Sequence, residues 1–495
     1  MLIAVKLQSS PVAVVIVALV LIGISRPIVR RVAETEESPW LERILTASLL
    51  LHLLAALAQV VVVTTLYHGV SDWHRYTIQG SLLAPDFRSF NFTLAHANVR
   101  GIVNDGSVSI ITGVVMAIVG TDLVATFMVF AWLSFLGAIL FYKAFTLTFP
   151  SAVAGHRRYA YLIFFLPSLL FWTADSSKES IMMVSLGICA YGIAKVLRHA
   201  PGGFTLLALG VIPGYFVRPN ELMVLLGGFA VALMVRSGSS GQRFSGLRRI
   251  GGLLFMGLLV GISVYLTVHY LHIGNGAGQL NLQKIGQNNS AGSGAGFGSS
   301  GVAYHSSPLY LPVDIYTVLF DPLGFNAHGT GEYVASLENL ILLGIAVSSY
   351  RQLRMLVRTS FCRPYVMMCL VYSLGFMYAF AGLGNLGLIY RERAMLLPFL
   401  LVLFAIPRSP KGKPNMFEWE YRRKDRKAFR EAVLRREALA RALRLSLAAE
   451  RAGASRRRPV PVGAGAPADG GPEPEARSEE RRAGKECRSR WSPYH

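Results

Sequence analysis

Long apolar segments constrain what this chain can fold into more than any other feature. Crossing about 30 Å of hydrocarbon as an α-helix takes roughly 20 mainly apolar residues, and segments such as 44–66 and 122–143 have that length. Inside lipid the backbone N–H and C=O groups must be paired within the segment, which favours helices. The sequence therefore predicts an all-α, polytopic integral membrane protein.

The composition agrees with this prediction. Hydrophobic residues make up 53% of the 495 residues and charged residues only 16%, compared with about 25% charged residues in an average soluble domain. We predict about eleven spanning helices, at residues 8–25, 44–66, 122–143, 159–173, 180–197, 203–217, 221–235, 250–272, 333–350, 364–383 and 388–406. The apolar segment 107–120 is too short to cross comfortably, and we predict that it lies in the membrane interface.

The net charge of +21 is concentrated in the C-terminal tail and in short connections. Every second connection between the predicted spans is basic, and short basic connections mark the cytoplasmic side. Examples are Arg30, Lys143, Arg158, Lys195 and Arg354. We therefore predict a multi-pass protein of the cell inner membrane, with outer loops 67–121 and 273–332, a cytoplasmic tail and no nucleic-acid partner.

The chain divides into five predicted regions. Residues 1–43 form an extra N-terminal transmembrane helix and a cytoplasmic loop, and residues 44–410 form the main transmembrane domain. Residues 411–453 are rich in Arg, Glu, Ala and Leu, which favours a cytoplasmic basic helix with charge pairs four residues apart. Residues 454–480 are predicted to be disordered. Residues 481–495 break with that composition, and we interpret them as non-native read-through sequence.

Charged and polar residues stand at the predicted outer ends of several spans. Such groups usually face a water-filled cavity or pair with one another. They comprise Asp72, His74, Arg75 and Tyr76, then Asp175, Lys178 and Glu179, then Arg218 and Glu221, and finally Tyr390, Arg391, Glu392 and Arg393.

Several of these residues also have a purely structural interpretation. Ser176 and Glu179 have the S-x-x-E spacing of a helix capping box, and Arg218 can extend its guanidinium to lipid headgroups. Arg391 and Arg393 are harder to explain in this way, because both stand on the outer side against the general charge trend. A guanidinium grips phosphate oxygens through two parallel hydrogen bonds, which favours phosphate binding there.

The cysteines indicate neither a disulfide framework nor a metal site. Cys189, Cys362, Cys369 and Cys487 have no paired or CxxC spacing. The carboxylates are scattered along the chain, and we predict no metal and no other cofactor.

The order of the outer segments resembles that of GT-C-type membrane glycosyltransferases. An acidic residue with a tyrosine four residues on appears in SDWHRYTIQG (71–80), and an apolar segment ending in glycine follows in GVVMAIVG (113–120). A proline-bearing span precedes a charged turn in FLPSLLFWTADSSKES (165–180). An Arg-Pro step then follows in GYFVRPNELMVLL (214–226), and a late arginine-rich helix start in YRERAMLLPFLLVL (390–403). The resemblance covers residues 44–235 and 364–406 and implies a GT-C-like helical bundle.

The resemblance also implies an activity and a set of residue roles. A sugar or glycan is transferred from a polyprenyl-phosphate or pyrophosphate carrier to a glycan or lipid acceptor at the outer face of the membrane. Asp72 becomes the candidate general base, and Arg391 and Arg393, seconded by Arg218 and Lys178, the candidate phosphate ligands. The predicted substrate-binding set is completed by His74, Arg75, Tyr76 and Tyr390.

Three departures leave other functions open. Asp72 lacks the adjacent Glu of the family's acidic pair, and an extra span precedes the family-like first helix. The long loop 273–332 resembles that of O-antigen polymerases and ligases, so glycan polymerisation stays open beside single-sugar transfer. A polysaccharide transporter and a non-catalytic scaffold also remain as alternatives.

Overall fold

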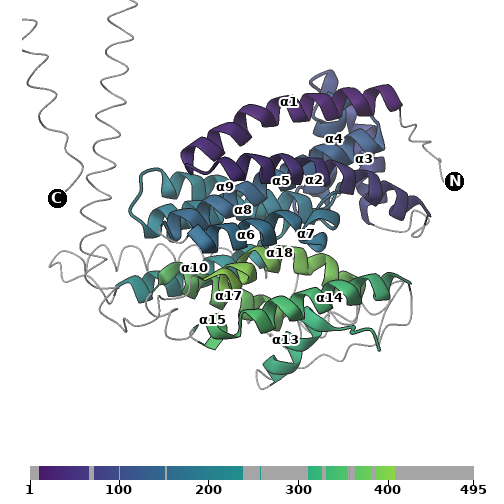
Figure 1. Cartoon of the computed structure of the whole chain (residues 1–495). Helices are drawn as coiled ribbons and strands as arrows, with labels where there is room; N and C mark the ends of the chain where they lie inside the picture. Colours follow the sequence, from purple (N-terminus) through teal and green to yellow (C-terminus); the bar gives the residue numbers. More distant parts are fainter. Residues whose placement is uncertain are drawn as a thin grey trace, which may run out of the picture. The chain divides into compact units, whose positions relative to one another are not determined.

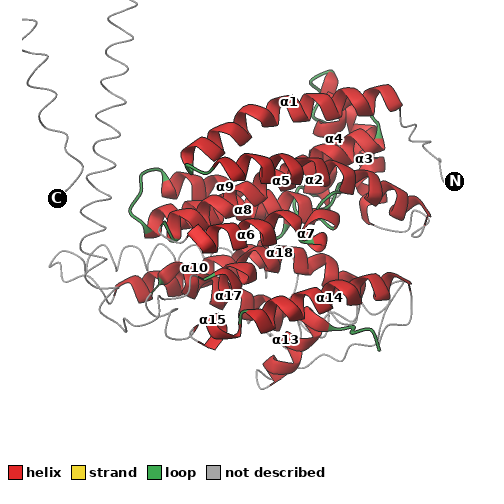
Figure 2. Cartoon of the chain, in the orientation of Figure 1, coloured by secondary structure: helices red, strands yellow, loops and turns green. Residues whose placement is uncertain are grey.

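The computed structural model describes residues 10–65, 72–99, 101–150, 153–237, 257, 310–325, 330–354, 356, 363–380 and 386–406. Within these ranges every regular element is a helix (Figure 2), which confirms the all-α prediction. All of them belong to one compact unit, Met1–Arg408. The predicted span 250–272 (except residue 257), loop residues 273–309 and everything predicted for 411–495 lie outside the described residues.

Four of the helices in the described ranges are long and apolar enough to cross a membrane. They are α1 (Pro11–Thr35), α2 (Pro39–Thr65), α5 (Leu123–Thr148) and α8 (Lys178–Leu197). These four helices indicate a membrane location, and their number is consistent with several crossings.

The prediction of eleven spanning helices was wrong. The predicted span 159–173 is divided into α6 (Val153–Phe165) and α7 (Pro167–Phe171), because proline lacks the backbone donor that a continuous helix needs. Other predicted spans are short, such as α9 (Gly203–Val217, 15 residues) and α17 (Pro364–Phe380, 17 residues). Helix α18 (Leu386–Ala405) has 20 residues but contains three charged ones.

The segment predicted as outer loop 67–121 is largely helical. Helix α3 (Asp72–Arg88) begins at Asp72, the predicted general base. A 3₁₀ turn (Ala95–Ala97) and then α4 (Asp105–Val119) follow it. An aspartate in a first helical turn is favoured by the helix dipole. Figure 1 shows α3 and α4 side by side at one end of the bundle.

Small residues let the central helices approach closely. A Cβ atom on Gly137 of α5 would lie 2.5 Å from the carbonyl oxygen of Met183 in α8. Gly187 of α8 faces Gly137 in the same way, and Gly210 of α9 lies against Cys189 of α8. Small residues at helix crossings are typical of packing in lipid, where the hydrophobic effect does not drive helices together.

Helix α18 occupies a central place among the remaining helices. It packs against α6, α7 and α8 and also against α13 (Leu311–Phe320), α14 (Thr330–Ser348), α15 (Tyr350–Arg354) and α17 (Figure 1). The buried hydroxyl of Tyr159 donates to the carbonyl oxygen of Pro398 at 2.9 Å. Helix α10 (Pro219–Ser237) completes the bundle beside α17.

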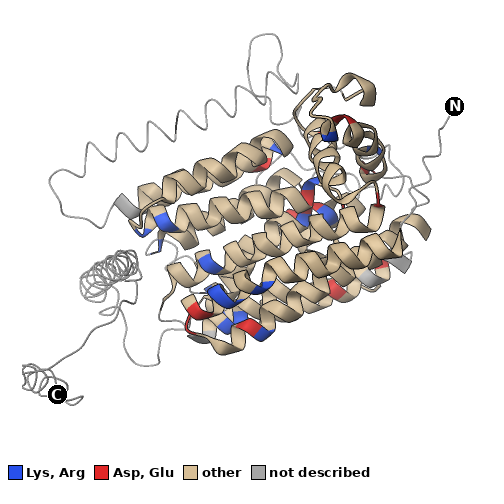
Figure 3. Ribbon diagram, turned by 90° about the horizontal axis from the view of Figure 1, so that it is seen from above, with Lys and Arg blue, Asp and Glu red and all other residues tan. Residues whose placement is uncertain are grey.

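The basic connections meet at one end of this bundle. Arg198, after α8, donates to the carbonyl oxygen of Thr148 at the end of α5. Arg363, before α17, lies 5.0 Å from the ring centre of Phe149, and Arg158 donates to Ser349 Oγ at 2.7 Å. Several Lys and Arg residues accordingly lie at the left-hand helix ends in Figure 3. The assignment of this end to the cytoplasm stays a prediction.

Candidate functional site

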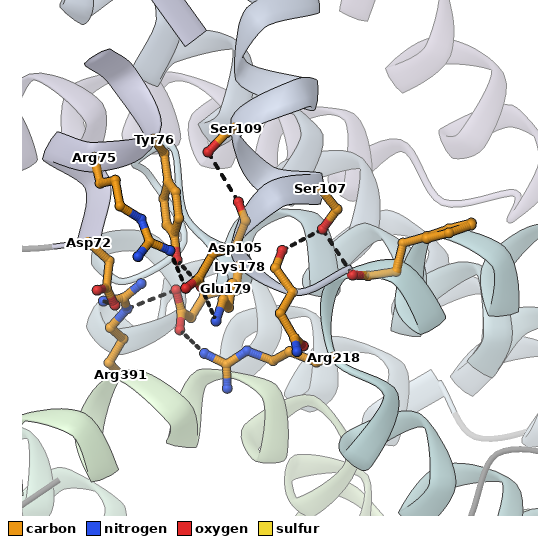
Figure 4. Close-up of polar contacts among 12 residues, drawn as sticks. Asp72, Arg75, Tyr76, Asp105, Ser107, Ser109, Lys178, Glu179, Arg218 and Arg391 are labelled. Atoms are coloured by element: carbon orange, nitrogen blue, oxygen red, sulfur yellow. Dashed lines mark hydrogen bonds and ion pairs between the residues drawn. The ribbon is translucent and has the colours of Figure 1, made fainter. Parts of the chain in front are cut away.

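A mixed acidic and basic cluster lies at the opposite end of the bundle, below the α3–α4 pair (Figure 4). We call it the charged cluster. Its members come from α3, α4, the start of α8, the α9–α10 junction and α18, and they are Asp72, Arg75, Tyr76, Asp105, Lys178, Glu179, Arg218, Glu221, Arg391 and Glu392. Segments more than 300 residues apart in the chain, α3 and α18, thus contribute to one site.

Arg391 contacts both Asp72, the predicted general base, and a buried acid of the charged cluster. Its Nη1 lies 3.3 Å from Asp72 Oδ2, and its Nε lies 2.8 Å from Glu179 Oε2. The Asp72 side chain is 59% exposed, whereas that of Arg391 is 14% exposed and Glu179 is buried. The guanidinium therefore has a solvent-facing acid on one side and a buried acid on the other.

Arg218 holds the buried part of the cluster together. Its Nη2 donates to Glu179 Oε1 at 2.6 Å, and its Nη1 contacts both Glu221 Oε1, at 2.8 Å, and Glu392 Oε2. All three carboxylates are buried. Burying several carboxylates is costly unless cations compensate them, and here Arg218, with Arg391 on Glu179, supplies part of that compensation.

A second set of contacts surrounds Asp105, the first residue of α4. Lys178 Nζ lies 2.6 Å from its Oδ1, Tyr76 Oη donates to the same oxygen at 2.8 Å, and Arg75 contacts Oδ2. Partial burial opposes ionisation of this carboxyl, but Lys178 and these hydrogen bonds outweigh it, so the pKa of Asp105 lies well below its usual range. Asp105 is thus an anion that ties α3 to α4 and α8.

Asp175 lies next to the cluster in the turn before α8. It is buried, and Gln59 of α2 donates to its Oδ2 at 3.5 Å. Burial raises the pKa of Asp175 to about 6, and Glu179 adds to this effect while Arg391 opposes it. This carboxyl consequently changes its charge nearer neutral pH than an ordinary aspartate does.

The structure does not bring three of the predicted site residues into this cluster. Arg393 points into the interior beside α13 and α14, where Nη1 donates to Asn339 Oδ1 at 2.6 Å and to the carbonyl oxygen of Leu319 at 3.1 Å. Tyr390 donates to the carbonyl oxygen of Asp321 and lies under the Arg393 guanidinium. The ring of His74 lies edge-to-face with that of the neighbouring Trp73, at 5.4 Å between ring centres.

The separation of Arg391 from Arg393 has a simple cause. Residues two apart on an α-helix point roughly 200° away from each other, so the two guanidinium groups leave α18 on different sides. The helical period was readable in the sequence, and it argues against a shared phosphate grip by these two arginines.

Sequence reasoning also missed the role of two acids. Asp105 follows no recognisable motif, and its importance depends on which helices surround it. Glu179 was interpreted as part of a capping box with Ser176. The residue that precedes α8 is instead Ser177, whose side chain makes no capping bond, and the Glu179 carboxylate binds two arginines.

The described residues contain no group of three or more His, Cys, Asp or Glu side chains arranged to hold a metal ion. Comparisons of the chain with protein-family models, with curated proteins and with solved structures found no match.

Proposed function

We propose that this protein is a membrane glycosyltransferase that transfers a sugar or glycan from a polyprenyl-phosphate or pyrophosphate carrier to an acceptor. The observation that supports it best is the exposed carboxylate of Asp72 beside Arg391, with Lys178 and Arg75 close by around Asp105. A carboxylate and several cations, placed at one end of a bundle of apolar helices, suit a substrate that has a lipid tail and an anionic head.

Exposure decides which cations are assigned to the phosphate. Arg75 is 51% exposed and Lys178 20% exposed, and Arg391 reaches the same exposed side through Asp72. Arg218 is instead committed to three buried carboxylates, and we assign it a positioning role. Arg393, buried among interior polar groups, has the same kind of role toward α13 and α14.

In the proposed reaction the acceptor hydroxyl oxygen attacks the anomeric carbon, and the bond from that carbon to the phosphate oxygen breaks. The phosphate leaves with the bonding electron pair, and preorganised cations stabilise its developing charge. The hydroxyl proton passes to Asp72 and from there to water, which reaches this exposed side chain. Direct displacement inverts the anomeric centre. Tyr76, which is buried and donates its hydroxyl to Asp105, is assigned a positioning role for that carboxylate.

The test uses the full-length protein in lipid nanodiscs with a polyprenyl-phosphate donor that carries a radiolabelled hexose. We expect transfer of label by the wild type and a loss of about 10²–10⁴-fold in Asp72→Asn, the usual contribution of a general base. Asp86→Asn is the matched control, because Asp86 lies on the same helix but pairs with His96.

Other outcomes would point to other functions. Full transfer by Asp72→Asn would remove the mechanism. Movement of the labelled donor across the bilayer without transfer of its sugar would indicate a transporter. Retention of the protein's cellular function in Arg391→Glu would indicate a scaffold.

A further inference from the structure

Arg391 makes two contacts of different character. Its Nε contact with Glu179, at 2.8 Å, is buried, and Arg218 holds the other oxygen of the same carboxylate at 2.6 Å. Its Nη1 contact with Asp72 is longer, at 3.3 Å, and ends on a side chain that is 59% exposed. The inner contact is therefore fixed by a network, whereas the outer contact is open to exchange.

Exchange at the outer contact costs little. Exposed ion pairs contribute little to stability, because water and salt screen them and two side chains must be held in place. A phosphate group offers a guanidinium more charge and two parallel acceptor oxygens. An anionic ligand that reaches Arg391 from the exposed side thus competes with Asp72 for Nη1.

The same contact occupies the carboxylate that is assigned as the base. While Asp72 accepts from Arg391, one of its oxygens is committed to the cation. Asp72 stands at the first residue of α3, and Tyr76 and Arg75 of this helix are held by Asp105. Release of the Asp72 side chain therefore leaves the rest of α3 in place and frees a carboxylate beside the newly bound phosphate.

We infer that the Asp72–Arg391 ion pair is a latch that the phosphate of the lipid-linked substrate opens. In the ligand-free protein the base is engaged by the cation, and the arriving phosphate takes over Arg391 and frees Asp72 for the acceptor hydroxyl. This inference rests on the proposed function and adds to it an order of events, with donor binding before activation of the base. It also assigns Asp72 a second property, competition with the substrate phosphate.

The latch makes an unusual prediction for binding. If Asp72 only accepts a proton, the loss of its charge affects phosphate binding through space alone, and the effect is the same with Arg391 as with Arg391→Gln. If Asp72 competes for Arg391, Asp72→Asn binds the ligand more tightly only while Arg391 is present, although its sugar transfer is about 10²–10⁴-fold slower. The gain corresponds to one exposed ion pair, which is about two- to fivefold in Kd.

The experiment measures the Kd of farnesyl phosphate for the full-length protein in nanodiscs, with inorganic phosphate as a second probe. We expect Asp72→Asn to tighten farnesyl phosphate binding about two- to fivefold, Arg391→Gln to weaken it and the control Asp86→Asn to leave it unchanged. The ratio of wild-type to Asp72→Asn affinities should approach one in high salt, because the exposed pair is screened. Asparagine is a favoured residue at helix starts, so α3 is expected to persist.

Each result separates the latch from the function on which it rests. Unchanged or weaker binding by Asp72→Asn, with weaker binding by Arg391→Gln, overturns the latch but leaves the phosphate site standing. If neither Asp72→Asn nor Arg391→Gln alters farnesyl phosphate binding, and the wild type transfers no sugar, both proposals are overturned. Equal wild-type affinities for inorganic phosphate and farnesyl phosphate assign the site to free phosphate and overturn a latch opened by a lipid substrate.

Discussion

The two ends of the helical bundle use cations in different ways. At the basic end, Lys143 and Lys195 lie 5.5 and 5.6 Å from the ring centre of Tyr191, and Arg157 lies 5.4 Å from that of Trp40. At the opposite end, the cations of the charged cluster contact carboxylates from other helices. Helix α8 connects the two ends, with Lys178 at its start and Lys195 in its last turn.

The difference teaches which charges depend on one another. An aromatic ring that binds a cation carries no charge of its own. Either side chain can therefore be substituted without leaving an uncompensated buried charge. A guanidinium among buried carboxylates cannot be removed without leaving uncompensated charge. The basic end is thus suited to a general electrostatic preference, such as orientation in a membrane, and the charged cluster to a specific arrangement.

The largest effect is expected for Arg218→Gln. This variant leaves the buried carboxylates of Glu179, Glu221 and Glu392 without their shared cation, which should lower the free energy of unfolding by about 3–5 kcal/mol. Thermal unfolding of the purified protein in detergent measures the loss. A variant as stable as the wild type would show that these acids are protonated or solvated, and the contrast between the two ends would fail.

A smaller effect concerns pH and Asp175. The pKa of this carboxyl in the folded protein is about 6, above its value in an unfolded chain, so the folded state binds the proton more tightly. Stability from this group is fully present below the unfolded pKa of about 3.9 and is lost as the pH rises through 6, by about 2–3 kcal/mol. Unfolding measured from pH 4 to 8 should show a smaller slope in Asp175→Asn than in the wild type. Equal slopes would contradict the assignment.

The third prediction tests the contacts around Asp105. Asp105→Asn removes the anion that Lys178, Arg75 and Tyr76 share, so α3 loses part of its attachment to α8. Because this side chain is partly exposed, we expect a loss of only about 1–2 kcal/mol, together with reduced sugar transfer in the nanodisc assay. Normal transfer in a destabilised variant would limit Asp105 to a structural role.

The smallest effect is expected at the basic end. Lys195→Gln removes one cation from the ring of Tyr191, a contact worth about 0.5–1 kcal/mol at an exposed site. Thermal unfolding measured beside Arg218→Gln should therefore show a much smaller shift. Comparable losses in the two variants would mean that the ends of the bundle do not differ as described.

Local properties of the chain were sufficient for the general architecture. Apolar length predicted the helices, since backbone pairing in lipid leaves few other solutions. The charge pattern placed residues as distant as Arg158, Arg198 and Arg363 in equivalent connections, and the structure brings them to the same end. The number of spans was overestimated, because hydropathy along a segment does not register the break at Pro167 or the short length of α9 and α17.

The partners within the charged cluster were decided by tertiary structure. Three consecutive residues of α18, Arg391, Glu392 and Arg393, contact Asp72, Arg218 and Asn339 respectively, because successive side chains leave a helix about 100° apart. The helical period thus separates the directions of the three side chains in advance. The neighbour that each one meets depends on where α3, the α9–α10 junction and α14 lie relative to α18. Local sequence fixes directions about one helix axis, whereas a site built from five helices requires their mutual packing.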